Sequence, residues 1–133
     1  MNLDNGPEPP IRLISILVGT MIGCILTYAY QVNLPSLFHE TYLWASLVVF
    51  VAIPVMAGFV SGLLHPTMAM KNGLCVGFFS GLFNSILATV KLIYSPIVIT
   101  MEVYAFSLFA VMSVFIWTIL GAVSALLARR VYD

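Results

Sequence analysis

Charge is the property that this sequence has least of. Only 8% of its 133 residues are Asp, Glu, Lys or Arg, compared with about 25% in an average soluble protein. The formal net charge is zero and there is no basic run, which argues against nucleic-acid binding. Because 62% of the residues are hydrophobic, an aqueous fold of this length could not cover its apolar surface. The scarcity of charge therefore excludes a soluble domain.

Cysteine and histidine are also scarce, with two of each. Cys24 lies past the middle of one apolar run and Cys75 near the start of another, so their depths in a membrane should differ by more than about 10 Å. A disulfide needs Cα atoms within about 7 Å, so we expect no pairing. His39 and His65 are expected at opposite membrane faces. The sequence therefore predicts no metal site and no cofactor.

The apolar runs also lack acidic residues. No Asp or Glu lies inside any of them, which disfavours a carrier coupled to protons or sodium ions. Lys91 lies near the end of one run, where its side chain can reach the membrane surface. No nucleophile, base and orienting group fall at one depth, and no phosphate-binding loop is present. We therefore predict no catalytic residues and a protein that is not an enzyme.

What the chain has in abundance is long apolar segments. Four of them reach about 20 residues, enough to cross a hydrocarbon core about 30 Å thick. They are residues 11–30, 43–64, 74–94 and 103–127. The sequence predicts an all-α integral membrane bundle of four transmembrane helices over residues 11–128, preceded by a polar tail, 1–10, and followed by a basic C-terminal segment, 129–133.

The distribution of basic residues predicts the orientation of the four spans. An even number of spans puts both termini on one side, and that side would carry Arg12, Lys71, Arg129 and Arg130. The opposite side would carry only Lys91. Since cytoplasmic loops carry an excess of Lys and Arg, we expect a cell-membrane protein with both termini in the cytoplasm.

Glycine recurs at four-residue spacing, which places it on one face of a helix as a glycine zipper. In a bilayer, small residues let neighbouring helices approach closely. The longest such stripe is in the third span and another is in the first, so we expect these two helices to pack along their glycine faces. The predicted helix-packing residues are Gly19, Gly23, Gly58, Gly62, Gly73, Gly77, Gly81 and Gly121.

The two halves of the chain share a pattern. A shift of 58 residues places Ser15 and Gly19 on Gly73 and Gly77, and both even spans end in the pattern G-x-V-S-[GA]-L-L, at Gly58 and at Gly121. This pattern favours two parallel helical-hairpin repeats about an axis normal to the membrane. The alternative is that glycine-rich membrane helices match through composition alone.

Asn84 is the one strongly polar side chain expected at mid-membrane. An amide there needs a partner, so the simplest role is an interhelical hydrogen bond. The alternative is that Asn84, with Ser80 and Ser85, lines a narrow polar path in an oligomer. Trp117, at a matching depth, is a candidate to donate its N–H to Asn84 or to a backbone carbonyl.

Two packing motifs resemble those of small four-span membrane proteins of unknown function from archaea and bacteria. They are Ala57-Gly58-Phe-Val-Ser61-Gly62 and Asn72-Gly73-Leu-Cys-Val-Gly77-Phe-Phe-Ser80-Gly81. The resemblance implies a four-helix fold and no particular activity. The chain lacks the first-helix glutamate of small multidrug exporters and the Phe-Ser-Thr-Phe pattern of small fluoride channels.

The leading functional hypothesis is a non-catalytic structural or accessory subunit that acts through helix association in the lipid bilayer. Its partner would be a second copy or another membrane protein. The main alternative is a small oligomeric channel or uncoupled transporter with Asn84 near its path. A phage-type or immunity-type membrane protein is a third interpretation.

Overall fold

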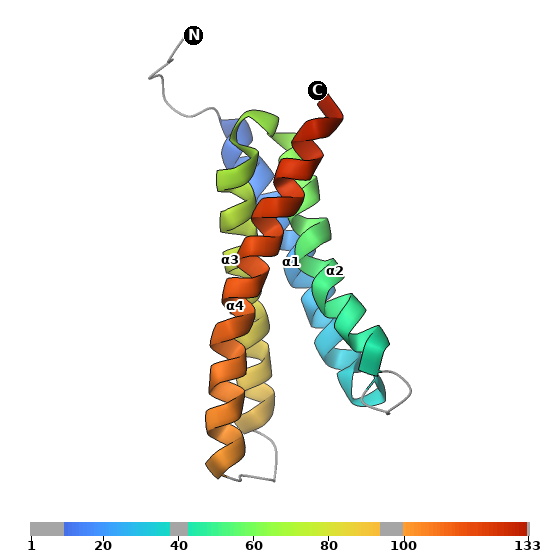
Figure 1. The fold of residues 1–133 in the computed structure, drawn as a ribbon, viewed down its shortest axis with the longest axis vertical. Helices are drawn as coiled ribbons and strands as arrows, with labels where there is room; N and C mark the ends of the chain where they lie inside the picture. Colours follow the sequence, from blue (N-terminus) through green and yellow to red (C-terminus); the bar gives the residue numbers. More distant parts are fainter. Residues whose placement is uncertain (1–9, 38–42, 94–99, 133) are drawn as a thin grey trace.

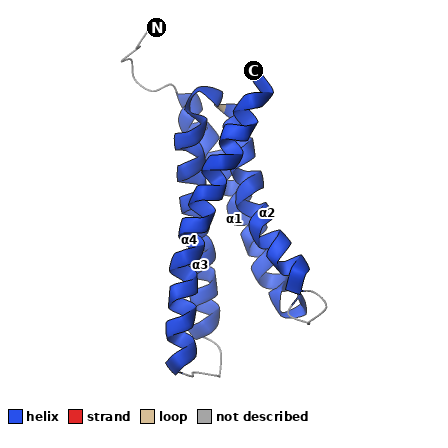
Figure 2. Cartoon of the chain, viewed as in Figure 1, coloured by secondary structure: helices blue, strands red, loops and turns tan. Residues whose placement is uncertain are grey.

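The computed structural model describes residues 10–37, 43–93 and 100–132. This part of the chain is helical and contains no strand (Figure 2). The long helices are α1 (Pro10–Leu37), α2 (Leu43–Leu64), α3 (Ala69–Ile93) and α4 (Thr100–Arg129), with 3₁₀ turns η2 (Pro66–Met68) and η3 (Arg130–Tyr132). The predicted all-α bundle is therefore confirmed.

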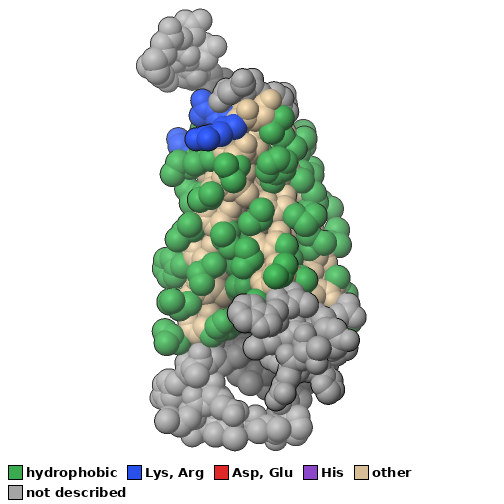
Figure 3. All heavy atoms as spheres, turned by 45° about the vertical axis from the view of Figure 1, so that its right-hand side comes forward, with side chains coloured by type: hydrophobic (Ala, Val, Ile, Leu, Met, Phe, Trp, Pro, Cys, Tyr) green, Lys and Arg blue, Asp and Glu red, His purple; other side chains and the backbone are tan. Residues whose placement is uncertain are grey.

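Each long helix contains a stretch that is long and apolar enough to cross a membrane. These stretches are Leu13–Val32, Leu47–Leu64, Pro66–Val90 and Ser107–Arg129, the third of which includes η2. Hydrophobic side chains are spread over the described surface in Figure 3, and many of the large ones are exposed. Such an exterior matches the hydrocarbon core of a bilayer.

The helices form two hairpins, α1–α2 and α3–α4, which lie side by side. Helix α1 contacts α2 and α3, helix α4 contacts the same two helices, and α2 contacts α3 between them. The start of α1, the end of α4 and the turn from α2 to α3 share one end of the bundle, called the termini end below (Figure 1). The two hairpins diverge toward the opposite end, called the far end (Figure 1).

Two of the predicted connections are partly helical. Helix α1 continues to Leu37, so Gln31 lies in a helix and not in a polar loop. Helix α3 begins at Ala69, so Lys71 and Asn72 also lie in a helix. These polar residues can stay helical because the buried amides of Gln31 and Asn72 each form a hydrogen bond with a neighbouring helix. Residues 1–9, 38–42, 94–99 and 133 lie outside the described part of the chain.

The glycine stripe of α3 packs against α4, which makes the prediction that it faces α1 wrong. A methyl group on Gly77 would meet the Trp117 carbonyl oxygen and lie 2.8 Å from Thr118 Cα. One on Gly73 would lie 2.9 Å from Ala122 Cα. Helix α1 instead contacts the adjacent stripe of α3, whose positions each come one residue before those glycines in the sequence. These close approaches need glycine, because a side chain there would separate the helices.

The glycines of α1 lie against both α2 and α3. A methyl group on Gly19 would be 2.9 Å from Val76 Cγ2 of α3 and 3.0 Å from the Ala57 carbonyl oxygen of α2. One on Gly23 would be 2.9 Å from Ser80 Cβ. The stripe of α1 therefore fits into the groove between the two helices.

Helices α2 and α4 meet through the positions that the proposed duplication equates. A methyl group on Gly58 would lie 2.8 Å from Gly121 Cα, and one on Gly62 would lie 2.7 Å from Ala125 Cα. A two-fold axis would also convert the α2–α3 contact into an equal α1–α4 contact, yet the described helices α1 and α4 make no comparable contact. The contacts among the described helices therefore depart from those of an exact two-fold arrangement.

Candidate functional site

A row of buried polar side chains follows the α1–α3 interface. The row arises because α1 carries small or polar residues at every fourth position from 15 to 31, while α3 does the same from 72 to 84 with Val76 interposed. We call this row the polar seam; its members are Ser15, Thr27, Gln31, Asn72, Ser80 and Asn84, all buried.

Each end of the seam is joined by a hydrogen bond between the hairpins. Gln31 Nε2 donates to Asn84 Oδ1 at 2.7 Å in the half nearer the far end. Asn72 Nδ2 donates to Ser15 Oγ at 2.9 Å near the termini end. In a membrane such bonds each contribute about 0.6–2 kcal/mol. They therefore help to hold α1 against α3 along most of its length.

The middle of the seam is closed by close packing. Ser80 lies directly against Gly23, and Thr27 Oγ1 donates to the Gly23 carbonyl oxygen at 2.6 Å. Ser61 of α2, also fully buried, lies against Gly19. Since a methyl group would not fit at either glycine, packed protein atoms close the seam at this depth.

The three residues predicted to line a path face different neighbours. Asn84 bonds to α1, and Ser80 lies against Gly23 of α1. Ser85 turns to α4, where its Oγ donates to the Ala110 carbonyl oxygen at 3.1 Å and lies 3.5 Å from Ser113 Oγ. Adjacent positions on a helix point about 100° apart, so Asn84 and Ser85 address different helices. The polar neighbour of Asn84 is therefore Gln31.

Gln31 and Asn72 belong to the site although both lie outside the predicted spans, which end at residue 30 and begin again at residue 74. A usable signal was present, because Gln31 follows Ser15, Gly19, Gly23 and Thr27 at the same four-residue spacing. Asn72 likewise precedes Val76 and Ser80 at that spacing. Continuing both stripes would have identified these two amides.

Trp117 is fully buried, but it does not bond to Asn84 as hypothesised. Its Nε1 has no hydrogen-bond partner among the described residues. Its ring instead packs on Phe50 of α2, with centroids 5.3 Å apart and planes tilted by 56°. Phe50 also lies 6.1 Å from the ring of Phe109. The hypothesis fails because Asn84 faces α1, whereas α4 packs against α2 and α3.

Several buried polar atoms have no partner in the described structure. They are Thr20 Oγ1, Gln31 Oε1, Ser61 Oγ, Ser80 Oγ and Trp117 Nε1. All five groups are neutral at pH 7. No group of three or more His, Cys, Asp or Glu side chains occurs among the residues searched, which are the described ones. Cys24 and Cys75 are free thiols.

Comparisons with protein-family models, curated proteins and solved structures find no match to this chain. The fold itself defines the class: four apolar helices of spanning length make this a multi-pass α-helical membrane protein. Its distinguishing internal feature is the neutral polar seam between the two hairpins.

Replacing Trp117 with Phe should be mild. The indole N–H makes no hydrogen bond within the described structure, so Phe retains the ring contact with Phe50 and loses mainly volume. We expect a loss of less than about 1.5 kcal/mol in the free energy of unfolding, against about 3–5 kcal/mol for Trp117→Ala. Reversible unfolding in mixed detergent micelles measures both values. Equal losses in the two variants would show that the N–H has an essential partner.

Proposed function

We propose that the protein is a non-catalytic membrane component that acts through its outer surface, by associating with another membrane-embedded chain or with a second copy of itself. The observation that carries the proposal is that the glycine faces of the helices already pack against other helices of the same chain. Each of the eight predicted packing glycines has a neighbouring atom 3.1 Å or less from where its Cβ would lie. These glycines assemble the bundle within one chain, so association would use the exposed side chains.

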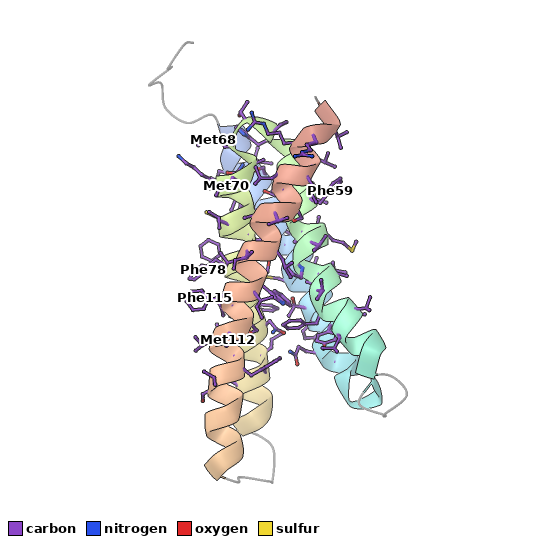
Figure 4. All side chains as sticks on the ribbon, viewed as in Figure 1. Phe59, Met68, Met70, Phe78, Met112 and Phe115 are labelled. Atoms are coloured by element: carbon purple, nitrogen blue, oxygen red, sulfur yellow. The ribbon has the colours of Figure 1, made fainter. Side chains whose placement is uncertain are left out.

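The surface best suited to a partner lies on α3 and α4. Figure 4 shows Met70, Phe78, Met112 and Phe115 projecting from the same side of the bundle. Together with Phe79, whose ring lies 5.7 Å from that of Phe78, we call these residues the aromatic face. Their exposed fractions range from 42% for Phe78 to 65% for Phe115. Aromatic residues and Met are enriched in protein interfaces, and Met adapts readily to a partner's shape.

The native mass of the protein, extracted gently from its host into lipid nanodiscs, tests this proposal. We expect a complex larger than one chain, either with other polypeptides or as a discrete homo-oligomer. Phe78→Ala with Phe115→Ala should reduce the complex to a monomer. A matched control removes two exposed side chains of α1, Leu17→Ala with Ile25→Ala, and should leave the complex intact. A monomeric wild-type protein would contradict the proposal.

A second candidate is an uncoupled channel or carrier, and the polar seam is the observation that favours it. Gln31 Oε1 and Ser80 Oγ are buried without partners in the described structure, which is costly in a membrane. Since the seam is closed at Gly23, passage would require α1 to separate from α3. Liposome flux of small neutral solutes tests this candidate: Asn84→Leu should change the flux without changing the native mass. No flux above that of empty liposomes would exclude it.

Both termini are proposed to lie in the cytoplasm. Lys71 lies in the first turn of α3 and Arg129 ends α4, and both helix ends belong to the termini end of the bundle. Concentration of basic residues at one end is the pattern of a cytoplasmic face. Labelling of single cysteines introduced at the N- and C-termini in intact and permeabilised cells measures the orientation.

A further inference from the structure

The termini end carries an exposed group of basic side chains. Lys71 lies in the first turn of α3, Arg129 is the last residue of α4, and Arg130 begins η3. All three are exposed, and Figure 3 shows the Lys and Arg side chains gathered at this end of the molecule. We call these three residues the basic patch.

No described side chain neutralises the basic patch. Side chains are described for residues 13–32, 47–90 and 107–131, and none of these residues is Asp or Glu. Arg129 stabilises α4, because a positive charge is favourable at the negative end of the helix dipole. Lys71 has no such effect on α3, because it lies at the positive end of the dipole of that helix. An anion near Lys71 would interact favourably with both the ammonium group and the helix terminus.

Apolar side chains lie exposed beside the basic residues. Met70 is 54% exposed, Leu126 is 38% exposed and Leu127 is 54% exposed, and each is within three positions of a basic residue in the sequence. A soluble anion would gain nothing from contact with these apolar side chains. A phospholipid matches it, because its phosphate lies at the membrane interface and its acyl chains extend toward the bilayer centre.

We propose that the basic patch binds the phosphate headgroup of an anionic phospholipid, whose acyl chains pack on Met70, Leu126 and Leu127. The charges supply the preference for anionic over zwitterionic lipid, and the apolar side chains keep the lipid in the bilayer. The site is made of exposed side chains, whereas the side chains of the polar seam, including Asn72 next to Lys71, are buried. The two proposed surfaces share only Met70, and the charge-removing variants used below leave the aromatic face unchanged.

The test uses the full chain in vesicles that contain equal amounts of phosphatidylglycerol and phosphatidylcholine. Native mass spectrometry of the released protein counts the two lipids that remain bound. We expect wild type to retain phosphatidylglycerol preferentially. Each Lys or Arg near the surface is worth about 1 kcal/mol, so Lys71→Gln and Arg130→Gln should each lower the preference about fivefold. Combining them with Arg129→Gln should abolish it.

The matched control is Lys91→Gln, which removes one positive charge close to the other end of α3. This control should retain the wild-type preference. An unchanged preference in the triple variant, or an equal loss in Lys91→Gln, would overturn the proposal. The two single variants retain most of the basic residues that set orientation, so they should insert correctly. A partial loss of lipid preference in them would therefore reflect lipid binding and not misinsertion. Inorganic phosphate that displaces the lipid at millimolar concentration would identify a soluble phosphate as the ligand and would also overturn the proposal.

Discussion

Gly77→Ala is expected to lower the free energy of unfolding by about 1–3 kcal/mol, which is the usual cost of overpacking. The added methyl group would meet the Trp117 carbonyl oxygen, and Thr118 Cα would lie 2.8 Å away. Both atoms belong to the α4 backbone, so no side-chain rotation can relieve the contact. The two helices would have to move apart, which would also loosen the neighbouring contact of Gly73 with Ala122.

Gly81→Ala is the matched control for this prediction. It adds the same atom to the same stripe of α3, but the nearest neighbour, Val114 Cα, is 3.1 Å away. A shift of a few tenths of an ångström accommodates that distance, so we expect a smaller loss than at Gly77. Reversible unfolding in mixed micelles, followed by helical circular dichroism, measures both variants. Equal losses at Gly77 and Gly81 would contradict the packing of this stripe on α4.

Asn84→Leu is expected to destabilise the bundle by about 1–3 kcal/mol. The substitution removes the acceptor at 2.7 Å from Gln31 Nε2 and leaves a buried amide without a partner. The buried location matters, because only 4% of Asn84 and 5% of Gln31 is exposed, so solvent cannot replace the lost bond. The resulting variant should separate its two hairpins more readily near the far end.

A double-mutant cycle isolates the Gln31–Asn84 interaction. With Gln31→Leu added, no unpaired amide remains, so the double variant should be less destabilised than the sum of the single variants. The coupling should be about 0.6–2 kcal/mol, as measured for polar pairs in membranes. Additive losses would show that the two amides do not interact. The same Asn84→Leu protein serves the flux and native-mass measurements, which distinguish a carrier from an associating subunit.

The sequence was sufficient to predict the four helices and their class. Apolar length decides whether a segment spans a bilayer, and that length is a local property. The segment 43–64 coincides with α2. The helix ends at Leu37 and Ala69 were missed because Gln31 and Asn72 resemble loop residues when their partners are unknown. A polar residue stays helical inside a membrane when another helix supplies its hydrogen bond.

Only the tertiary structure decided which faces meet. Small-residue spacing showed that Gly73, Gly77 and Gly81 form a surface, but any neighbouring helix could have used it. The choice of α4 depends on the shapes of all four helices together, since α3 offers a second stripe, with Asn72, Ser80 and Asn84, to α1. Helical periodicity depends on residues that are close in the sequence, so it can be recognised from the sequence. A partner such as Gln31 for Asn84 lies 53 residues away in the chain and is fixed only when the hairpins pack.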